Sequence, residues 1–91
     1  STTGISEAEL LNSFSVYPNP NNGEVSLSFE NINSVESVSI ISMVGQQVYS
    51  TQDLAPEMNI NLNSKLKNGV YFVRVESKNG NYAVRKMTVV K

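Results

Sequence analysis

Residues able to perform covalent or metal chemistry are scarce in this chain. Its 91 residues include no cysteine and no histidine. The commonest nucleophile–base pairs, a disulfide framework and thiolate or imidazole metal sites are therefore excluded. A serine nucleophile would need a lysine as its base, and the pair Ser64–Lys65 lies in a polar turn. The composition predicts a protein that is not an enzyme and that holds no metal or cofactor.

The stretch "VYPNPNNG" (16–23) is the most unusual one in the sequence. Pro18 cannot donate to a β-ladder, so a strand must end there or lie at an edge. Asn19 precedes a proline and is driven to an extended conformation, and Pro20 restricts φ again. A tight reversal follows at the asparagines and the glycine. We expect a stiff corner between two strands, and no cation site, because the stretch itself contains no carboxylate.

A second motif, Leu66-x-x-Gly69-x-Tyr71, stands at the start of an alternating segment. A tyrosine just after a turn that enters a late sandwich strand can return its hydroxyl to upstream backbone, as in a tyrosine corner. We expect Tyr71 to stabilise the fold and not to contact a ligand.

The charged residues are divided unequally along the sequence. Residues 1–57 hold seven acidic residues and no base, whereas residues 65–91 hold all seven basic residues and one acid. The favoured interpretation is that acidic and basic strands interleave and pair across the sheets. The other is a basic C-terminal edge presented to a partner. Nucleic-acid binding is disfavoured by the overall net charge of −1.

The elements that position these residues are predicted to be strands. In "EVSLSFE" (24–30), apolar and polar residues alternate as in a strand with one buried face. In "VESVSIISMVG" (35–45) the alternation changes phase, which indicates a bulge or a stretch covered on both faces. Seven segments in all, separated by turn signals about every 8–12 residues, predict an all-β antiparallel sandwich.

The predicted domain spans residues 14–91, after a linker at residues 1–13. Ser6 and Glu9 in the linker match a capping box and allow one short helical turn. The sequence has neither a signal-peptide pattern at its start nor an apolar run near the ~18 residues of a membrane span. If the protein is exported, its address lies elsewhere in a longer precursor or is the domain itself.

The last segment combines basic residues with strand alternation. Met87 and Val89 face one way, and Val90 faces the other. A terminal edge strand is a natural docking template for a partner strand. The residues of this recognition hypothesis are Arg85, Lys86, Met87, Val89, Val90 and Lys91.

Four segments occur in the order and spacing of a known family: "SVYPNPNNG", "VSIISMVGQQV", "LKNGVYFVRVES" and "YAVRKMTVVK". Together they resemble the C-terminal type A sorting domain of the type IX secretion system of Bacteroidota, over residues 14–91. One departure is Ser42, where the family often has aspartate or asparagine ahead of the Gly45 turn, which affects a local turn hydrogen bond. The matching motif residues are Tyr17, Pro18, Asn19, Pro20, Gly23, Gly45, Leu66, Gly69 and Tyr71.

The resemblance implies an Ig-like seven-stranded antiparallel β-sandwich at the end of a larger secreted protein. It implies an address that the outer-membrane translocon recognises once the fused N-terminal cargo has reached the periplasm. A sortase-like cysteine peptidase would typically remove the domain, and the cargo would be released or attached to surface lipopolysaccharide. Edge strands would also allow self-association of the domain.

Two other functions remain open on the sequence. One is a carbohydrate-binding or adhesive module, which needs exposed aromatic rings, and the candidates for these are Tyr49 and Tyr82. The other is a passive, fibronectin-like spacer.

Overall fold

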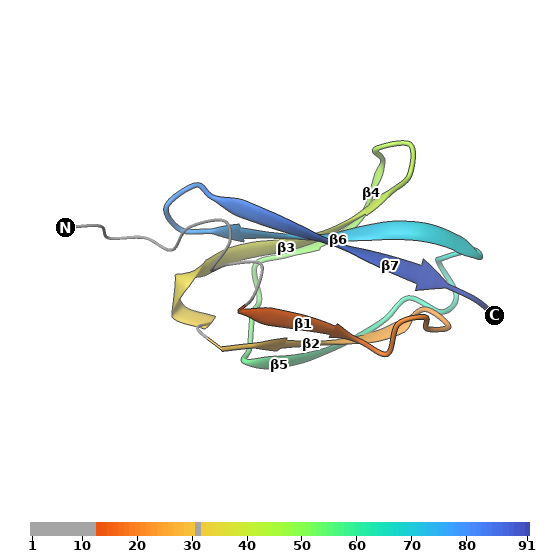
Figure 1. Cartoon of the computed structure of the whole chain (residues 1–91), viewed down its shortest axis with the longest axis horizontal. Helices are drawn as coiled ribbons and strands as arrows, with labels where there is room; N and C mark the ends of the chain where they lie inside the picture. Colours follow the sequence, from red (N-terminus) through yellow and green to blue (C-terminus); the bar gives the residue numbers. More distant parts are fainter. Residues whose placement is uncertain (1–12, 31) are drawn as a thin grey trace.

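The computed structural model describes residues 13–30 and 32–91. The predicted linker, except for its last residue, and its helical turn lie outside the described residues. Seven strands are present (Figure 1), which confirms the all-β prediction. Within the described ranges, no helix is long and apolar enough to cross a membrane. The elements are β1 (Phe14–Tyr17), β2 (Glu24–Phe29), a 3-10 turn (Ile32–Ser34), β3 (Val35–Ser42), β4 (Gln47–Thr51), β5 (Glu57–Asn61), β6 (Gly69–Ser77) and β7 (Tyr82–Val89).

The strands form two antiparallel sheets that pack face to face. One sheet has the order β1-β2-β5, and the other has the order β4-β3-β6-β7. In Figure 1 the three-stranded sheet lies below the four-stranded one, and the edge strands β1 and β7 lie one above the other. The first strand and the last strand of the domain are therefore neighbours across the gap between the sheets.

The core lies between the sheets and is filled by alternate side chains of the strands. Val25 and Leu27 of β2 and Val73 and Val75 of β6 are all buried, as is Ile60 of β5. Burial of apolar surface at about 25 cal/mol per Å² is the main force that holds the two sheets together. The intervening residues of each strand point outward, as the period of two in the sequence predicts.

The bulge predicted in the third strand lies in its neighbour, β4. The β3–β4 register shifts between Ile40 and Ile41, whose partners are Tyr49 and Gln47, so the extra residue is Val48 of β4. The pairing of β3 with β6 continues without a shift through Ile40, Ile41 and Ser42. Ile41 therefore takes the face opposite to the buried Ile40, as in a regular strand, and is half-buried there.

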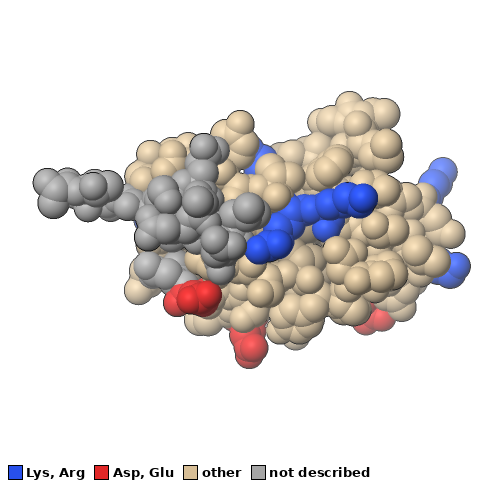
Figure 2. Space-filling model, in the orientation of Figure 1, with Lys and Arg blue, Asp and Glu red and all other residues tan. Residues whose placement is uncertain are grey.

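The charged groups gather on different parts of the surface. Figure 2 shows basic side chains across the middle of the face that holds β1 and β7, and again at the end near the C-terminal residue. Acidic side chains lie along the lower side, which is the side that the three-stranded sheet occupies in Figure 1. The guanidinium of Arg74 in β6 lies over the ring of Tyr82, 4.4 Å from the ring centroid. Arg74 thus makes a cation–π contact, whereas the favoured interpretation of the charges expected basic residues to pair with acids.

Candidate functional site

The proline–asparagine corner lies against the outer edge of the last strand. The Asn19 side chain bridges two backbone groups of β7: Nδ2 donates to the Lys86 carbonyl at 3.1 Å, and Oδ1 accepts from the Thr88 N–H at 3.1 Å. The prolines on both sides of Asn19 follow cis peptide bonds. A carboxamide carries both a donor and an acceptor, so one side chain can replace a neighbouring strand over this length.

Asn21 continues the same edge with its backbone. Its N–H donates to the Thr88 carbonyl at 2.9 Å, and its carbonyl accepts from the Val90 N–H at 2.7 Å. The Asn21 side chain is buried and closes the corner on itself: Nδ2 donates to the Pro18 carbonyl at 3.1 Å, and Oδ1 accepts from the Gly23 N–H at 2.8 Å. The corner and the last strand are thus one hydrogen-bonded unit.

This pairing changes the predicted role of the C-terminal edge. The outward backbone groups of β7 from the Lys86 carbonyl to the Val90 N–H already have partners in the corner. A partner strand could therefore add at this half of β7 only by displacing the corner, and recognition of the last strand stays a prediction. Self-association through an edge strand also stays a prediction.

The residues of the recognition hypothesis divide into buried and exposed ones. Met87 is fully buried and Val89 is 1% exposed, so their side chains are part of the core and not of a recognition surface. Lys86 and Lys91 are exposed, as is Val90 at 56%. Arg85 is half-buried, and its guanidinium lies 5.5 Å from the centroid of the Phe14 ring.

Lys91 lies at the end of this surface and is tied to the loop before β6. Its N–H donates to Asn68 Oδ1 at 2.9 Å, and its ammonium donates to the Asn63 carbonyl. Three distant segments meet there: the corner, the loop after β5 and the C-terminal residue.

Gly23 ends the corner in a position that only glycine fits. Its φ is +101°, and a Cβ built there would lie 2.7 Å from the Asn63 Cα. The backbones are held together at this point, because the Leu62 N–H donates to the Gly23 carbonyl at 2.7 Å. The glycine of the motif therefore has a steric reason in this chain.

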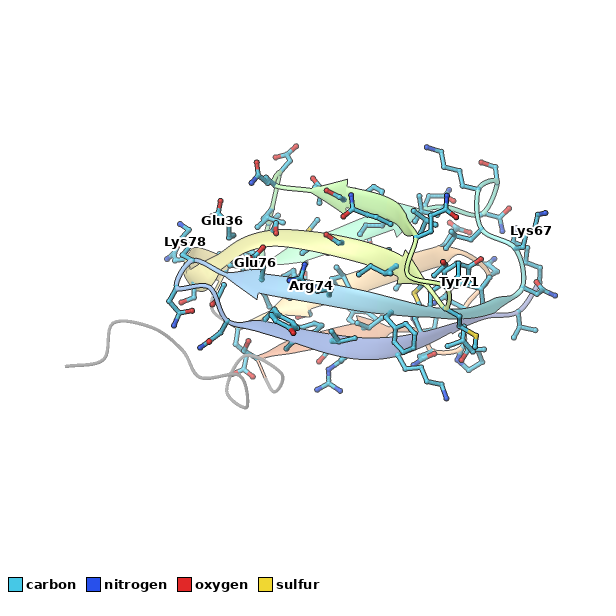
Figure 3. The ribbon with its side chains drawn as sticks, turned by 90° about the horizontal axis from the view of Figure 1, so that it is seen from above. Glu36, Lys67, Tyr71, Arg74, Glu76 and Lys78 are labelled. Atoms are coloured by element: carbon cyan, nitrogen blue, oxygen red, sulfur yellow. The ribbon has the colours of Figure 1, made fainter. Side chains whose placement is uncertain are left out.

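Tyr71 forms the tyrosine corner that the sequence predicts. Its hydroxyl donates to the Lys67 carbonyl at 2.9 Å, which holds the loop before β6 against the strand (Figure 3). Leu66 is 2% exposed and anchors the same loop in the core, and Gly69 is the first residue of β6. This motif stabilises the fold.

Replacement of Tyr71 by phenylalanine is expected to lower the free energy of unfolding by about 1 kcal/mol, because the Lys67 carbonyl loses its partner. The melting temperature should fall by roughly 4–8 °C. Tyr49→Phe is the matched control, since in the described part of the chain the Tyr49 hydroxyl makes no hydrogen bond. Thermal unfolding followed by circular dichroism measures both variants, and equal losses in both would contradict the assigned bond.

The turn at Gly45 is closed by a side-chain hydrogen bond although Ser42 stands where the family often has aspartate or asparagine. The Ser42 hydroxyl accepts from the Gln46 N–H at 3.2 Å, and the Gly45 N–H donates to the Ser42 carbonyl at 2.9 Å. Serine therefore performs the turn-closing role of an aspartate or asparagine here.

The exposed aromatic residues differ from those predicted. Tyr82 is 46% exposed, as expected, but Tyr49 is half-buried and packs against the core. Tyr17, which was not among the candidates, is 44% exposed. Alternation in "FSVY" could have found it, because Phe14 and Val16 face the core. Within the described ranges, no three histidine, cysteine, aspartate or glutamate residues come together as metal ligands would.

Comparison with known proteins gives a family and similar solved structures. A family model described as a secretion system C-terminal sorting domain matches residues 15–91. A structure of PorZ, described as an essential bacterial surface component of the type-IX secretion system of Porphyromonas gingivalis, has 23% sequence identity and a TM-score of 0.73. The match covers 98% of this chain and 13% of that one, so the shared fold is a small part of the larger protein. No curated protein matches the chain.

Proposed function

Because this chain belongs to the family of C-terminal sorting domains of the type IX secretion system, we propose that its translocon recognises the surface where the corner joins β7. The domain is a sorting signal for type IX secretion, carried by a cargo protein whose destination is the outer membrane, the cell surface or the medium. We call the proposed site the corner–β7 surface, formed by residues 17–23 and 86–91.

One observation carries this proposal: the hydrogen bonds of Asn19 and Asn21 to the outer edge of β7. They join the motif that marks the family at one end of the chain to the basic strand at the other end. The sequence hypothesis assigned the corner to the fold and recognition to the last strand. The geometry favours a single surface with both functions, which exists only when the domain is folded.

The exposed groups of this surface set the chemistry of the partner. Lys86 and Lys91 give it positive charge, and Val90 adds exposed apolar area. A partner with an acidic, partly apolar contact face would complement it, and the charges would steer the encounter. We assign the domain no catalytic step and no cofactor, in keeping with a sorting-signal family.

Fusion of residues 13–91 to a periplasmic reporter, in a host with this secretion system, tests the function directly. We expect the reporter to reach the cell surface or the medium, whereas the unfused reporter stays in the periplasm. Fractionation and immunoblotting measure the outcome. A passive spacer would leave the fusion in the periplasm, and that result would contradict the proposal.

The same fusion tests the fate of the domain. We propose that a sortase-like cysteine peptidase separates the domain from its cargo on the N-terminal side of β1, in the segment that the sequence predicts as a linker at residues 1–13. A version of the fusion that includes residues 1–91 should then appear outside the cell smaller by about the mass of the chain, which is 10.0 kDa. An exported product of full size would contradict the removal step and leave the sorting function intact.

A further inference from the structure

The outer face of the three-stranded sheet carries a shallow hollow that begins at the corner and continues over β2 and β5. Its volume is about 390 Å³, which is within the range of roughly 300–1,000 Å³ of small-molecule sites. It lies on the far side of the sheet from the core. Its polar and rim residues are Pro18, Asn22, Glu24, Ser26, Asn59 and Asn61.

Strand register brings the polar residues of the hollow together. Glu24 of β2 is paired with Asn61 of β5, and Ser26 is paired with Asn59. The residue between each pair on β2 and β5 is buried, so these side chains all point away from the core. The outer face therefore presents two adjacent polar rows.

Backbone N–H groups engage the amide oxygens of Asn22 and Asn61, which fixes the direction of their two amide nitrogens. Asn22 Oδ1 accepts from the Glu24 N–H and Asn61 Oδ1 accepts from the Asn63 N–H, both at 3.1 Å. Asn59 Oδ1 accepts from the Ser26 hydroxyl at 2.6 Å. A backbone N–H only donates, so the atom that faces it must be the oxygen.

Two oriented amide nitrogens, those of Asn22 and Asn61, are consequently left as donors at this hollow, and Asn59 supplies a third while its oxygen accepts from Ser26. Among the described residues, the Nδ2 groups of Asn22, Asn59 and Asn61 donate to no protein acceptor. The carboxylate of Glu24 adds an acceptor between them, and neither lysine nor arginine lines the hollow. The set suits a neutral ligand with many hydroxyl groups, since each hydroxyl both accepts and donates.

An exposed aromatic ring completes the set. Tyr17 is paired with Ser26, so it lies in the same cross-strand row as Ser26 and Asn59. Its side chain is 44% exposed, and Pro18 follows it at the rim of the hollow. An exposed ring offers an apolar face of the kind that stacks on the C–H face of a sugar ring, beside donors for its hydroxyls.

We propose that this hollow is a saccharide-binding site, in which Tyr17 stacks on a sugar ring and the amides of Asn22, Asn59 and Asn61 donate to its hydroxyls. Glu24 accepts a hydrogen bond from the same sugar. The site extends from the corner onto β2 and β5, so it shares Tyr17, Pro18 and Asn22 with the corner–β7 surface, whereas Glu24, Ser26, Asn59 and Asn61 lie outside that surface.

Binding of the purified chain to an array of neutral oligosaccharides and bacterial polysaccharides tests this site, with calorimetric titration of the strongest array ligand. The Asn59→Asp variant keeps the oxygen that accepts from Ser26 but replaces the amide donor. We expect Asn59→Asp and Tyr17→Ala each to weaken binding at least about ten-fold, a loss of roughly 1.4 kcal/mol. Asn33→Asp and Tyr82→Ala are the matched controls, exposed residues outside the hollow, and should bind as the unaltered chain does.

Two probes made from one polysaccharide, one freed from lipid and one lipid-linked, show whether the site recognises the sugar alone or needs the lipid as well. Equal binding of both probes indicates recognition of the sugar alone, as we expect, and binding of the lipid-linked probe alone would overturn the proposal. Absence of binding to every saccharide on the array would also overturn it, as would loss of binding in Tyr82→Ala with binding retained in Tyr17→Ala. The readout is binding in solution, so neither result depends on export of the domain.

Discussion

Replacing Lys86 by glutamate and Val90 by aspartate together is expected to reduce export of a fused reporter at least about ten-fold, with the fusion retained in the periplasm. Both side chains are exposed, and only the backbones of these residues bond to the corner. The fold should therefore remain, and the melting temperature should change by only a few degrees. An acidic, partly apolar partner would meet like charge at two positions, and like charges brought together across an interface cost several kcal/mol.

A double variant with the same change in charge at other positions is the control for this experiment. Lys78→Glu with Val44→Asp alters an exposed lysine in the turn after β6 and a valine that is 87% exposed in the turn after β3. Export of this variant should match that of the unaltered fusion. Equal losses of export in both double variants would show that net charge decides export and that the corner–β7 surface does not.

Point variants test this surface better than removal of residues 86–91 would, because that segment also contains part of the core. Met87 and Val89 are buried in the core. Their loss would cost about 2–5 kcal/mol for the methionine alone, enough to unfold many small domains. A deletion would thus abolish export whether the surface or the fold is recognised.

Replacing Gly23 by alanine is expected to destabilise the domain by about 3 kcal/mol, the largest effect on stability that we predict. The positive φ of +101° contributes part of this cost. The rest arises because the new Cβ would lie 2.7 Å from the Asn63 Cα, which forces the corner away from the loop after β5. The melting temperature should fall by roughly 12–24 °C.

The Gly45→Ala variant separates the two causes. Gly45 also has a positive φ, +87°, but no atom lies within 4 Å of the position of its Cβ. It should therefore lose only the cost of backbone strain, about 1 kcal/mol. Denaturant unfolding of both variants measures the difference, and a Gly23→Ala variant no less stable than Gly45→Ala would contradict the steric explanation.

The strands and turns of this domain could be predicted from sequence because their signals are local. The alternation in "EVSLSFE" specifies which residues of β2 are buried. The bulge is an exception, since its extra residue, Val48, lies in β4 and not in β3, where the pattern changes phase. The return of the Tyr71 hydroxyl to upstream backbone is also local, since Lys67 is only four residues away. Steric preferences and periodicity act over such short distances regardless of the rest of the chain.

The hollow and its tyrosine could be predicted only in part. Alternation places Tyr17 on the outer face of β1, but no sequence rule brings it into one row with Ser26 and Asn59. That row depends on the order β1-β2-β5 and on the register of two strand pairs. A shift of one residue in either register would turn the polar residues toward the core.

By itself, the sequence determined that this protein is an all-β domain without the residues for common enzyme chemistry, and that its corner is stiff. Only the tertiary structure decided what the corner does. Asn19 bonds to Lys86 and Thr88, which are 67 and 69 residues away. An asparagine amide bonds to any backbone group that is close enough. The residues around Asn19 in the sequence therefore cannot identify partners so far along the chain. The packing of the two sheets brings β1 and β7 together, and with them the two ends of the domain.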